Sequence, residues 1–469
     1  MLKKINPLTL FLLCFLFIWV GLTLVIHSST SVSPDTVENM MWGMKAHLTY
    51  DKHPGLGPLF LIPFTYLFNP LLANLLAVSA CVLVTWIYLY QTIRLFYPIK
   101  ESMMLLLLSV ASFFYMGEFF IQYNQNIILL PFWSASTYYF IKAIGDNKSL
   151  DWILLAIVAA LGVYAKFQIG LLAIAMFGCI IIKFDKKYFK NIIIALIIGI
   201  IFLLPGIVSL YSIDFETLTY VTDRVSKPSS GFFHGLIWAS FDSIFQLLNL
   251  SIAFIVIIFL SVKKSIVKSK SNSHYDKKTL IILGLFPYII FILLESLNGM
   301  LPTEWLVCST VFLLPAIYAL LGLKLIDVNL NLHKLVGFII IVNMVYFISF
   351  NLNTFFNNRI EHNNIGDSVA LSAEKFLTEN NLPQPDYASG NWKYGFYLSV
   401  FMESKPHYYR VWQDNEKSGV LLLAYPGCNN TIDVTVYGYK LLKKGCEKVK
   451  LIDKYNTQYE NFDFYLAKK

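Results

Sequence analysis

Two carboxylates and two basic side chains lie close together in a polar stretch that separates two long apolar runs. The stretch covers residues 33–58 and contains Asp35, Glu38, Lys52 and His53. A positioned carboxylate can accept the proton of an attacking hydroxyl, and fixed cations can stabilise the negative charge of a phosphate group. Because apolar runs flank the stretch, we expect a site for a phosphate-bearing substrate at the edge of a membrane.

The first part of this stretch is expected to form a short helix. Ser33 is a suitable N-cap, and Pro34 suits the first turn that follows it. We expect this helix to lie on the membrane surface, with its apolar face down and its carboxylates towards water. At 3.6 residues per turn its side chains divide into two faces, with Val37, Met40, Met41 and Met44 on one and Asp35, Glu38 and Trp42 on the other.

The composition of the whole chain indicates a membrane protein. Of 469 residues, 57% are hydrophobic and only 14% are charged, and the mean hydropathy is +0.59. A soluble domain could not bury so much apolar surface, so we expect a chain that crosses the membrane many times. The formal net charge of +8 would also suit a nucleic-acid-binding protein. The lysines cluster between apolar runs, however, as the positive-inside rule requires, so nucleic acid is not an expected partner.

About eleven apolar segments have the length needed to cross a hydrocarbon core of roughly 30 Å. The segment at 59–97 is broken by Asn69 and Pro70 into a short entering piece and one full span. With the N-terminus inside, the lysine-dense loops all fall on one side, and the loop around Asp35, the loops at 118–126 and 214–227, and the tail fall on the other. The expected spans are 10–26, 59–97, 103–117, 127–144, 152–165, 169–182, 192–211, 232–262, 280–297, 305–323 and 335–350.

From about residue 351 the composition changes to that of an ordinary soluble protein. We expect a transmembrane domain at 1–350, whose first outer loop covers 28–58, and a soluble domain at 351–469 on the outer side. Sequence patterns predict a helix at 368–380 and strands at 397–402, 420–425 and 431–437, so this domain would be α/β or α+β. Cys428 and Cys446 both lie in it, and an oxidising compartment favours a disulfide between them.

Several short motifs occur in an order that resembles a known family. Asp-x-x-Glu at 35–38 is followed by Trp-Gly at 42–43 and Tyr-x-Lys-His-Pro at 50–54; then come Tyr-Asn-Gln-Asn at 123–126, Trp133, Trp152 and Gly-Val-Tyr-Ala-Lys at 162–166. This series is similar to the polyprenyl-phosphate-dependent glycosyltransferases of the GT-C class. The nearest kin would be bacterial relatives of the protein O-mannosyltransferases and of the lipid A aminoarabinose transferase, in glycosyltransferase families 39 and 83.

The resemblance covers about the first 180 residues well and the remainder only in architecture. One departure from the family's pattern concerns Lys-His-Pro-Gly at 52–55, where many relatives have two consecutive prolines. The turn after His53 is therefore expected to differ from that of the relatives.

The resemblance implies a specific transfer reaction. A sugar would leave a polyprenyl phosphate with inversion, the lipid tail would lie between helices, and the lipid phosphate would be the leaving group. Asp35 matches the acidic residue of the family's first loop and would be the general base, with Glu38 as a second catalytic or site-lining carboxylate. Substrate contacts, with the lysines at the phosphate, would come from Lys52, His53, Lys166, Asn124 and Asn126.

Each acidic or basic residue of the first loop also has a structural interpretation. Asp35 could simply favour the helix dipole, and Glu38 could face water. Lys52 could be an anchor that reaches towards the lipid headgroups. His53, which precedes Pro54 in the sequence, could be a packing residue.

The residues further along the chain have structural interpretations as well. Lys166 interrupts an apolar run, where an unpaired ammonium is costly, so it could pair with Glu118 or extend outward. Asn124 and Asn126 could be loop caps. For these residues the sequence leaves both interpretations open.

Other kinds of chemistry have no clear signal in the sequence. It contains no phosphate-cradling glycine loop, no nucleophile elbow and no cluster of Cys and His ligands, so no metal site or other cofactor is predicted. A divalent cation between a carboxylate and the phosphate is compatible with the class. A lipid or small-molecule transporter or flippase would also explain many spans, but it should show repeated halves and charges deep in its spans. A scaffold subunit would not need the arrangement of Asp35 and Lys52.

The sequence therefore predicts an α-helical polytopic glycosyltransferase of the GT-C type in a bacterial inner (plasma) membrane. Its site and its soluble domain would face the periplasm or the cell exterior. Its partners would be a polyprenyl-phosphate sugar, membrane lipids, and an acceptor hydroxyl or phosphate on lipid A or another lipid, a glycan or a protein. No recognisable motif encodes the sugar, hexose or pentose, or the acceptor.

Overall fold

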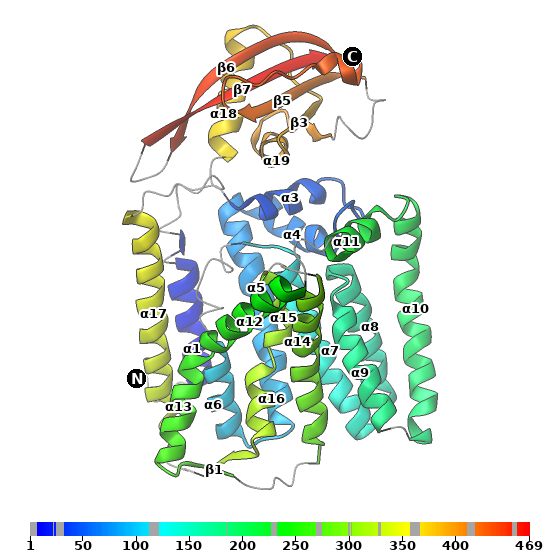
Figure 1. Cartoon of the computed structure of the whole chain (residues 1–469), viewed down its shortest axis with the longest axis vertical. Coiled ribbons are helices and arrows are strands. Elements are labelled where there is room, and N and C mark those ends of the chain that lie inside the picture. Colours follow the sequence, from blue (N-terminus) through cyan, green and yellow to red (C-terminus); the bar gives the residue numbers. More distant parts are fainter. Residues whose placement is uncertain are drawn as a thin grey trace.

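The computed structural model describes residues 7–21, 23–24, 32–111, 122–183, 185–226, 232–268, 274–298, 301, 303–326, 330–356, 366–409, 418–452 and 457–469. Figure 1 shows a bundle of steep helices with a smaller domain above it. Two short helices lie across the upper end of the bundle, α3 (Pro34–Gly43) and α11 (Glu216–Ser226). Because α3 lies between the bundle and the upper domain, the polar stretch of the sequence is placed at the boundary between them.

Several of the described helices suit a membrane. Four are long and apolar enough to cross one: α5 (Pro70–Arg94), α7 (Gln125–Asp146), α14 (Lys277–Asn298), and the run Lys186–Tyr211 that includes α10 (Phe189–Tyr211). Shorter apolar helices are α4 (Leu56–Leu67), α8 (Ser149–Ala165), α9 (Ile169–Ile182) and the first part of α17 (Leu332–Phe356). The multi-pass helical architecture is thus confirmed, whereas the number of about eleven spans stays a prediction.

Two segments that were expected to be single spans are not single helices. The segment at 232–262 forms α12 (Phe232–Asn249) and α13 (Ser251–Val262), which are bent by 56° relative to one another. The segment at 305–323 is divided among the 3₁₀ turn η6 (Thr303–Leu306), α15 (Val307–Thr310) and α16 (Leu313–Leu320). Pro315 has no backbone N–H to bond the carbonyl of Val311, so the helix starts afresh with the proline in its first turn.

The remaining elements of the bundle are short. The N-terminal end has α1 (Pro7–Phe15) and a π-helical turn, η2 (Leu16–Gly21), and α6 (Ile99–Val110) lies beside α5. At the lower end in Figure 1, β1 (Ile266–Lys268) pairs antiparallel with β2 (Leu323–Leu325). The expected break after α4 is confirmed, because Asn69 caps α5 by accepting a hydrogen bond from the Leu72 N–H at 2.9 Å.

The start of α3 is as predicted, but its environment is not. Ser33 Oγ accepts a hydrogen bond from the Thr36 N–H at 3.3 Å, which confirms the N-cap. The expectation that the carboxylate face points to water is wrong for Glu38 and Trp42, which are each only 5% exposed. Helix α19 (Trp392–Phe401) of the upper domain packs on α3, and α4 packs on it as well. Amphipathicity could not reveal that a distant part of the chain covers the polar face.

The upper domain contains a mixed five-stranded sheet in the order β4-β3-β5-β7-β6. Strand β3 runs parallel to β4 and β5, whereas β7 runs antiparallel to both β5 and β6. Helix α18 contacts β6, and α19 contacts β3, β4 and β5. The bounds are α18 (Gly366–Glu379), β3 (Tyr387–Gly390), β4 (His407–Tyr408), β5 (Val420–Pro426), η7 (Val434–Tyr437), β6 (Lys440–Ile452) and β7 (Thr457–Lys468).

The helix predicted at 368–380 and the strand predicted at 420–425 are confirmed as α18 and β5. The strands predicted at 397–402 and 431–437 are wrong. The first lies mainly in α19, which begins at an Asn391 N-cap and is buried on most of its sides, so its apolar residues follow no helical stripe. The second contains the 3₁₀ turn η7, capped by the Asp433 side chain. Helix α17 continues to Phe356, six residues beyond the expected end of the first domain.

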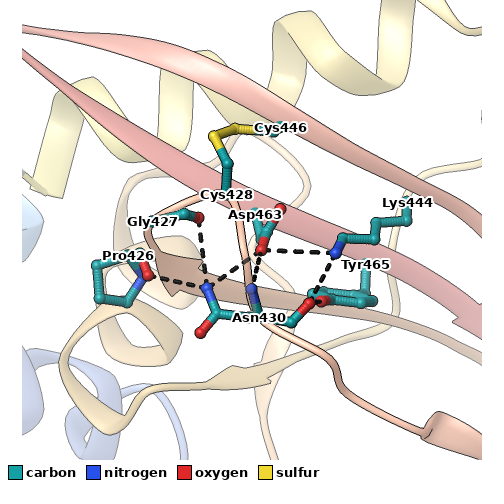
Figure 2. The surroundings of a disulfide bond; sticks show 8 residues. All are labelled: Pro426, Gly427, Cys428, Asn430, Lys444, Cys446, Asp463 and Tyr465. Carbon is teal, nitrogen blue, oxygen red and sulfur yellow. Dashed lines mark hydrogen bonds and ion pairs between the residues drawn. A yellow bond between two sulfur atoms is a disulfide. The ribbon is translucent and has the colours of Figure 1, made fainter.

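The expected disulfide between Cys428 and Cys446 is present and joins the loop after β5 to β6 (Figure 2). Beside it, Asp463 Oδ2 accepts hydrogen bonds from the Asn430 backbone N–H at 2.9 Å and from the Asn430 side chain at 3.1 Å. Lys444 Nζ lies 3.7 Å from the same carboxylate oxygen. The covalent bond and these polar contacts together hold the loop against the sheet.

Candidate active site

All seven residues proposed from the sequence line one cavity of about 550 Å³ at the upper end of the bundle. They come from α3, the loop after it, the start of α7 and the residue that follows α8, so the fold joins positions that are more than a hundred residues apart in sequence. The volume is in the range of small-molecule sites, roughly 300–1,000 Å³. The seven are Asp35, Glu38, Lys52, His53, Asn124, Asn126 and Lys166.

Hydrogen bonds to the bundle hold α3 at the cavity. Thr36 Oγ1 donates to Asn74 Oδ1 at 3.0 Å, and the Tyr123 N–H donates to the same oxygen at 2.8 Å. Gln125 Nε2 donates to Asn39 Oδ1 at 2.9 Å. Helix α3 is therefore fixed to both α5 and the start of α7, which sets the position of its carboxylates.

The loop that carries Lys52 and His53 is a tight turn. The Tyr50 N–H donates to the His53 carbonyl at 3.0 Å, and the Gly55 N–H donates to the Leu48 carbonyl at 2.8 Å. A Cβ on Gly55 would lie 2.2 Å from the His47 carbonyl oxygen, so only glycine fits there. This close approach accounts for the glycine that follows Pro54.

Lys52 forms an ion pair with Glu38, with Nζ and Oε1 2.6 Å apart. The ammonium also lies 5.2 Å from the centre of the Trp392 ring and 5.5 Å from that of Phe396, both on α19. Glu38 is thus a buried counter-ion rather than a side chain that faces water, and Lys52 is held at the cavity instead of reaching towards headgroups.

Asp35 lies on α3, lines the cavity and is exposed to it. Desolvation by the surrounding protein is the largest influence on its carboxyl group and raises its pKa above the usual value of 3.8. Lys52, Lys166 and Lys393 act in the opposite direction, and Glu304 raises the pKa further. A carboxylate with a raised pKa is a stronger base than an ordinary aspartate.

Lys166 directly follows the last residue of α8, and its side chain is buried. Its Nζ donates to Asn126 Oδ1 at 2.6 Å and lies 4.5 Å from the centre of the Trp305 ring. Desolvation lowers the pKa of this ammonium to about 8, opposed by the nearby Cys308, Glu304 and Asp35. Glu118, the alternative partner suggested by the sequence, lies outside the described residues.

The two asparagines before α7 differ in role. Asn124 is the N-cap of α7, and its Oδ1 accepts from the Asn126 N–H at 3.0 Å and from the Ile127 N–H at 3.3 Å. Its capping interpretation is therefore confirmed. Asn126 instead uses its side-chain oxygen to hold Lys166. His53 packs edge-on against Trp42 and Tyr220, with ring centres 6.0 and 5.7 Å apart, which agrees with its packing interpretation.

Several residues that line the cavity were not identified from the sequence. Glu304 and Trp305 sit in a polar interruption between two apolar runs, and that interruption was the available signal. Trp392 and Tyr408 belong to the upper domain, whose placement over α3 has no signature in the sequence. The additional lining residues are Gln122, Gln125, Tyr220, Glu304, Trp305, Trp392 and Tyr408.

A second cavity of about 320 Å³ adjoins the first and is mainly apolar. The two share five lining residues, which include all three basic side chains of the site: Lys52, His53, Lys166, Tyr220 and Trp305. Beyond this junction the second cavity is lined by side chains of α9, α11 and α14, among them Leu171, Ile174, Val221, Phe291 and Leu294. An apolar groove therefore meets a polar cavity at a ring of cationic and aromatic groups.

The described part of the chain contains no group of three or more His, Cys, Asp or Glu side chains arranged to hold a metal ion. Asp35 and Glu304 both line the first cavity, and both carboxylates act electrostatically on Lys166. These groups suit proton transfer and anion binding.

Comparison with known proteins agrees with this architecture. A family model described as dolichyl-phosphate-mannose-protein mannosyltransferase matches residues 52–211. The crystal structure of ArnT from Cupriavidus metallidurans bound to undecaprenyl phosphate matches with a TM-score of 0.59 and 11% identity, over 98% of this chain and 97% of that one. The chain has the GT-C fold. The crystal structure of the same ArnT in the apo state matches with a TM-score of 0.57 and 10% identity, over 97% of each chain.

The GT-C resemblance predicted from the short motifs, to the O-mannosyltransferases and to the lipid A aminoarabinose transferase, is thereby confirmed. No curated protein sequence matches this chain significantly. The family segment begins at Lys52, so Asp35 and Glu38 precede it. Glu38 is connected to the matched segment by structure, through its ion pair with Lys52, and Asp35 lines the same cavity as Lys52.

Proposed function

We propose that this chain is an integral-membrane glycosyltransferase that moves a sugar from a polyprenyl-phosphate donor to an acceptor on the outer side of a bacterial plasma membrane. The observation that carries the proposal is the junction of the two cavities. An apolar groove ends at Lys52 and Lys166, and the polar cavity beyond them contains Asp35. A lipid tail, a phosphate and a sugar need these three environments in this order.

The donor is proposed to bind with its lipid tail in the groove lined by α9, α11 and α14. Its phosphate would then lie between Lys52 and Lys166, where two ammonium groups and the His53 ring meet. The relative ArnT was crystallised with undecaprenyl phosphate, a lipid of this class, which supports a polyprenyl carrier. Among the described residues Lys166 is held by Asn126 and Trp305 and forms no ion pair with a carboxylate, so its charge can be directed to an anion.

The transfer step uses Asp35 as the general base. An acceptor hydroxyl attacks the anomeric carbon and gives its proton to Asp35, while the bond from that carbon to the phosphate oxygen breaks. The phosphate leaves with the electron pair, and its negative charge is stabilised by Lys52 and Lys166. Attack from the side opposite the phosphate inverts the anomeric configuration. Asp35 and the lysines share one cavity, which supports this division of roles.

The proposed orientation places α3, the cavity and the upper domain on the outer side. The lysine-dense loops expected inside include those around Lys183 and Lys264, which lie at the ends of α9 and α13 away from the cavity. The Cys428–Cys446 disulfide supports an oxidising compartment for the upper domain. The second carboxylate, Glu38, is proposed to hold Lys52 in place.

The test follows release of free polyprenyl phosphate by mass spectrometry when purified protein receives membrane lipid extract. Asp35→Asn should abolish the release while still binding the lipid, because the amide cannot accept the proton. Asp214→Asn, at an exposed position outside the cavity, is the matched control and should be as active as the wild type. Equal activity of Asp35→Asn would exclude Asp35 as the base. If the wild type never consumes a sugar lipid across varied extracts, a transport function replaces this proposal.

A further inference from the structure

The upper domain supplies part of the cavity wall, and that part is aromatic. Trp392 at the start of α19 and Tyr408 on β4 line the polar cavity but not the apolar groove. Trp392 is 40% exposed, and the ammonium groups of Lys52 and Lys393 lie 5.2 and 5.6 Å from the centre of its ring. A large aromatic surface kept open towards a polar cavity indicates a ligand that covers it.

The aromatic wall is held in a fixed arrangement. The rings of Trp392 and Phe396 lie 5.6 Å apart, and those of Phe396 and Tyr408 lie 4.5 Å apart. Gly395 allows this packing, because a Cβ there would lie 2.8 Å from the Tyr408 ring. The Asn391 N-cap fixes the start of the helix, with its Oδ1 accepting from the Lys393 N–H at 3.3 Å. The rings are therefore positioned before any ligand binds.

We infer that this aromatic wall binds the acceptor, and that the acceptor is a saccharide whose ring lies on Trp392. The inference rests on the proposed function and names its acceptor class. A sugar ring has apolar C–H faces and a hydroxyl rim, so it matches an indole face that is bordered by carboxylates and amides. Glu38, Gln122, Gln125 and Asp35 line the same cavity as Trp392 and supply such groups. The donor lipid occupies the groove on the other side of Lys52, which leaves the wall under the upper domain to the acceptor.

A peptide acceptor would need a different surface. One common way to bind an extended peptide is to add it as a strand to an exposed sheet edge, which requires several free backbone groups. The edge strand nearest the cavity, β4, has only two residues. A stacking surface with polar borders is present, and a long free strand edge is not found beside it in the described residues. The geometry therefore favours a saccharide.

The experiment measures binding of the full chain, held in lipid nanodiscs, to an array of immobilised saccharides and to an array of Ser- and Thr-containing peptides. Wild type should bind a subset of the saccharides. Trp392→Ala should weaken that binding by at least about tenfold, as loss of a central aromatic anchor does. Trp392→Tyr should retain part of it, and Tyr459→Ala, at a similarly exposed aromatic of the same domain outside the cavity, should change nothing.

A second readout separates acceptor binding from donor binding and from folding. Because Trp392 also contacts Lys52, Trp392→Ala could act on the donor phosphate. When no acceptor is present, water can take its place and the sugar is transferred to water, which releases polyprenyl phosphate slowly. The inference expects Trp392→Ala to retain this slow release and to unfold at a temperature near that of wild type. The inference would be overturned if Trp392→Ala bound saccharides as wild type does, or if wild type bound only peptides. It would also be overturned if Trp392→Ala lost both the slow release and saccharide binding.

The failure of this inference can be distinguished from failure of the proposed function. Asp35→Asn should lose polyprenyl phosphate release but keep saccharide binding that is weakened by a further Trp392→Ala change, because stacking on Trp392 needs no proton transfer. Saccharide binding that depends on Trp392, in a protein that never releases polyprenyl phosphate, would overturn the transferase function and leave the aromatic wall as a saccharide site. Polyprenyl phosphate release without saccharide binding would overturn the saccharide inference and leave the transferase function standing.

Discussion

Glu38 Oε1 lies 2.6 Å from Lys52 Nζ, and both groups are largely enclosed between α3 and α19. Because of this ion pair, the two carboxylates of the first motif have different environments. Glu38 is committed to Lys52, whereas Asp35 lines the cavity with its carboxylate exposed to it. The same contact joins the loop after α3 to the upper domain, because the ammonium also lies over Trp392.

Replacing Glu38 by Gln should weaken the position of Lys52 without removing the base. The ion pair loses its negative partner while Lys52 keeps its charge, so we expect the free energy of unfolding to fall by about 1–3 kcal/mol. Polyprenyl phosphate release should be slower but measurable, with the main effect on the KM of the donor. Chemical denaturation and release kinetics check the two parts. If Glu38→Gln is as inactive as Asp35→Asn while it still binds donor, Glu38 has a catalytic role of its own.

The acid limb of the pH–rate profile should report Asp35. Desolvation and Glu304 raise the pKa of this carboxyl above 3.8, so activity should be lost as pH falls through a value higher than that of an ordinary aspartate. Glu304→Gln removes a negative charge that opposes ionisation of Asp35, and it should therefore shift the acid limb to lower pH. Measurement of kcat/KM against pH for both proteins decides this. A shift to higher pH would show that Glu304 is not acting through its charge.

The alkaline limb should report Lys166. Its pKa is lowered to about 8 by desolvation, so phosphate stabilisation should decline as pH rises through that value. Lys166→Arg keeps its charge at any accessible pH and should move the alkaline limb upward. Lys166→Met should slow release by roughly 100-fold or more, the usual effect of losing one group that stabilises transition-state charge. An unchanged limb in Lys166→Arg would assign the alkaline titration to another group.

Gly55→Ala should distort the turn that presents Lys52 and His53. The added methyl group would meet the His47 carbonyl oxygen at 2.2 Å, and backbone on both sides leaves no flexible side chain to yield. We expect a loss of about 2 kcal/mol or more in stability, together with weaker donor binding. Gly178→Ala, at a glycine outside both cavities with open space around its Cβ position, is the matched control. Equal thermal unfolding of the two variants would show that the turn tolerates a side chain.

Local chemistry made part of this fold predictable. The Ser33 cap, the break before Pro70, α18, β5 and the disulfide all depend on residues close in sequence or on residue type. The seven site residues were found because their motif order resembles a family. Their position in one cavity agrees with that reading, and their chemical roles stay predictions.

What the sequence did not reveal depends on packing between distant segments. The face of α3 that was expected to meet water is covered by α19, and nothing local to α3 encodes that contact. Helix α19 itself was interpreted as a strand, so Trp392 could not be recognised as part of the site. Two expected spans are divided because Pro315 and the bend near Leu250 interrupt apolar runs whose average composition still suits a membrane helix.

The upper domain, residues 366–469, is the last described part of the chain to be synthesised, yet it supplies the wall over Lys52. Because this domain follows the bundle in the chain, the segments with Asp35, Lys52 and Lys166 are synthesised before it. A chain interrupted before residue 366 would therefore hold the charged groups of the site without Trp392 and Tyr408. The order of synthesis makes completion of the cavity depend on the folding of the upper domain.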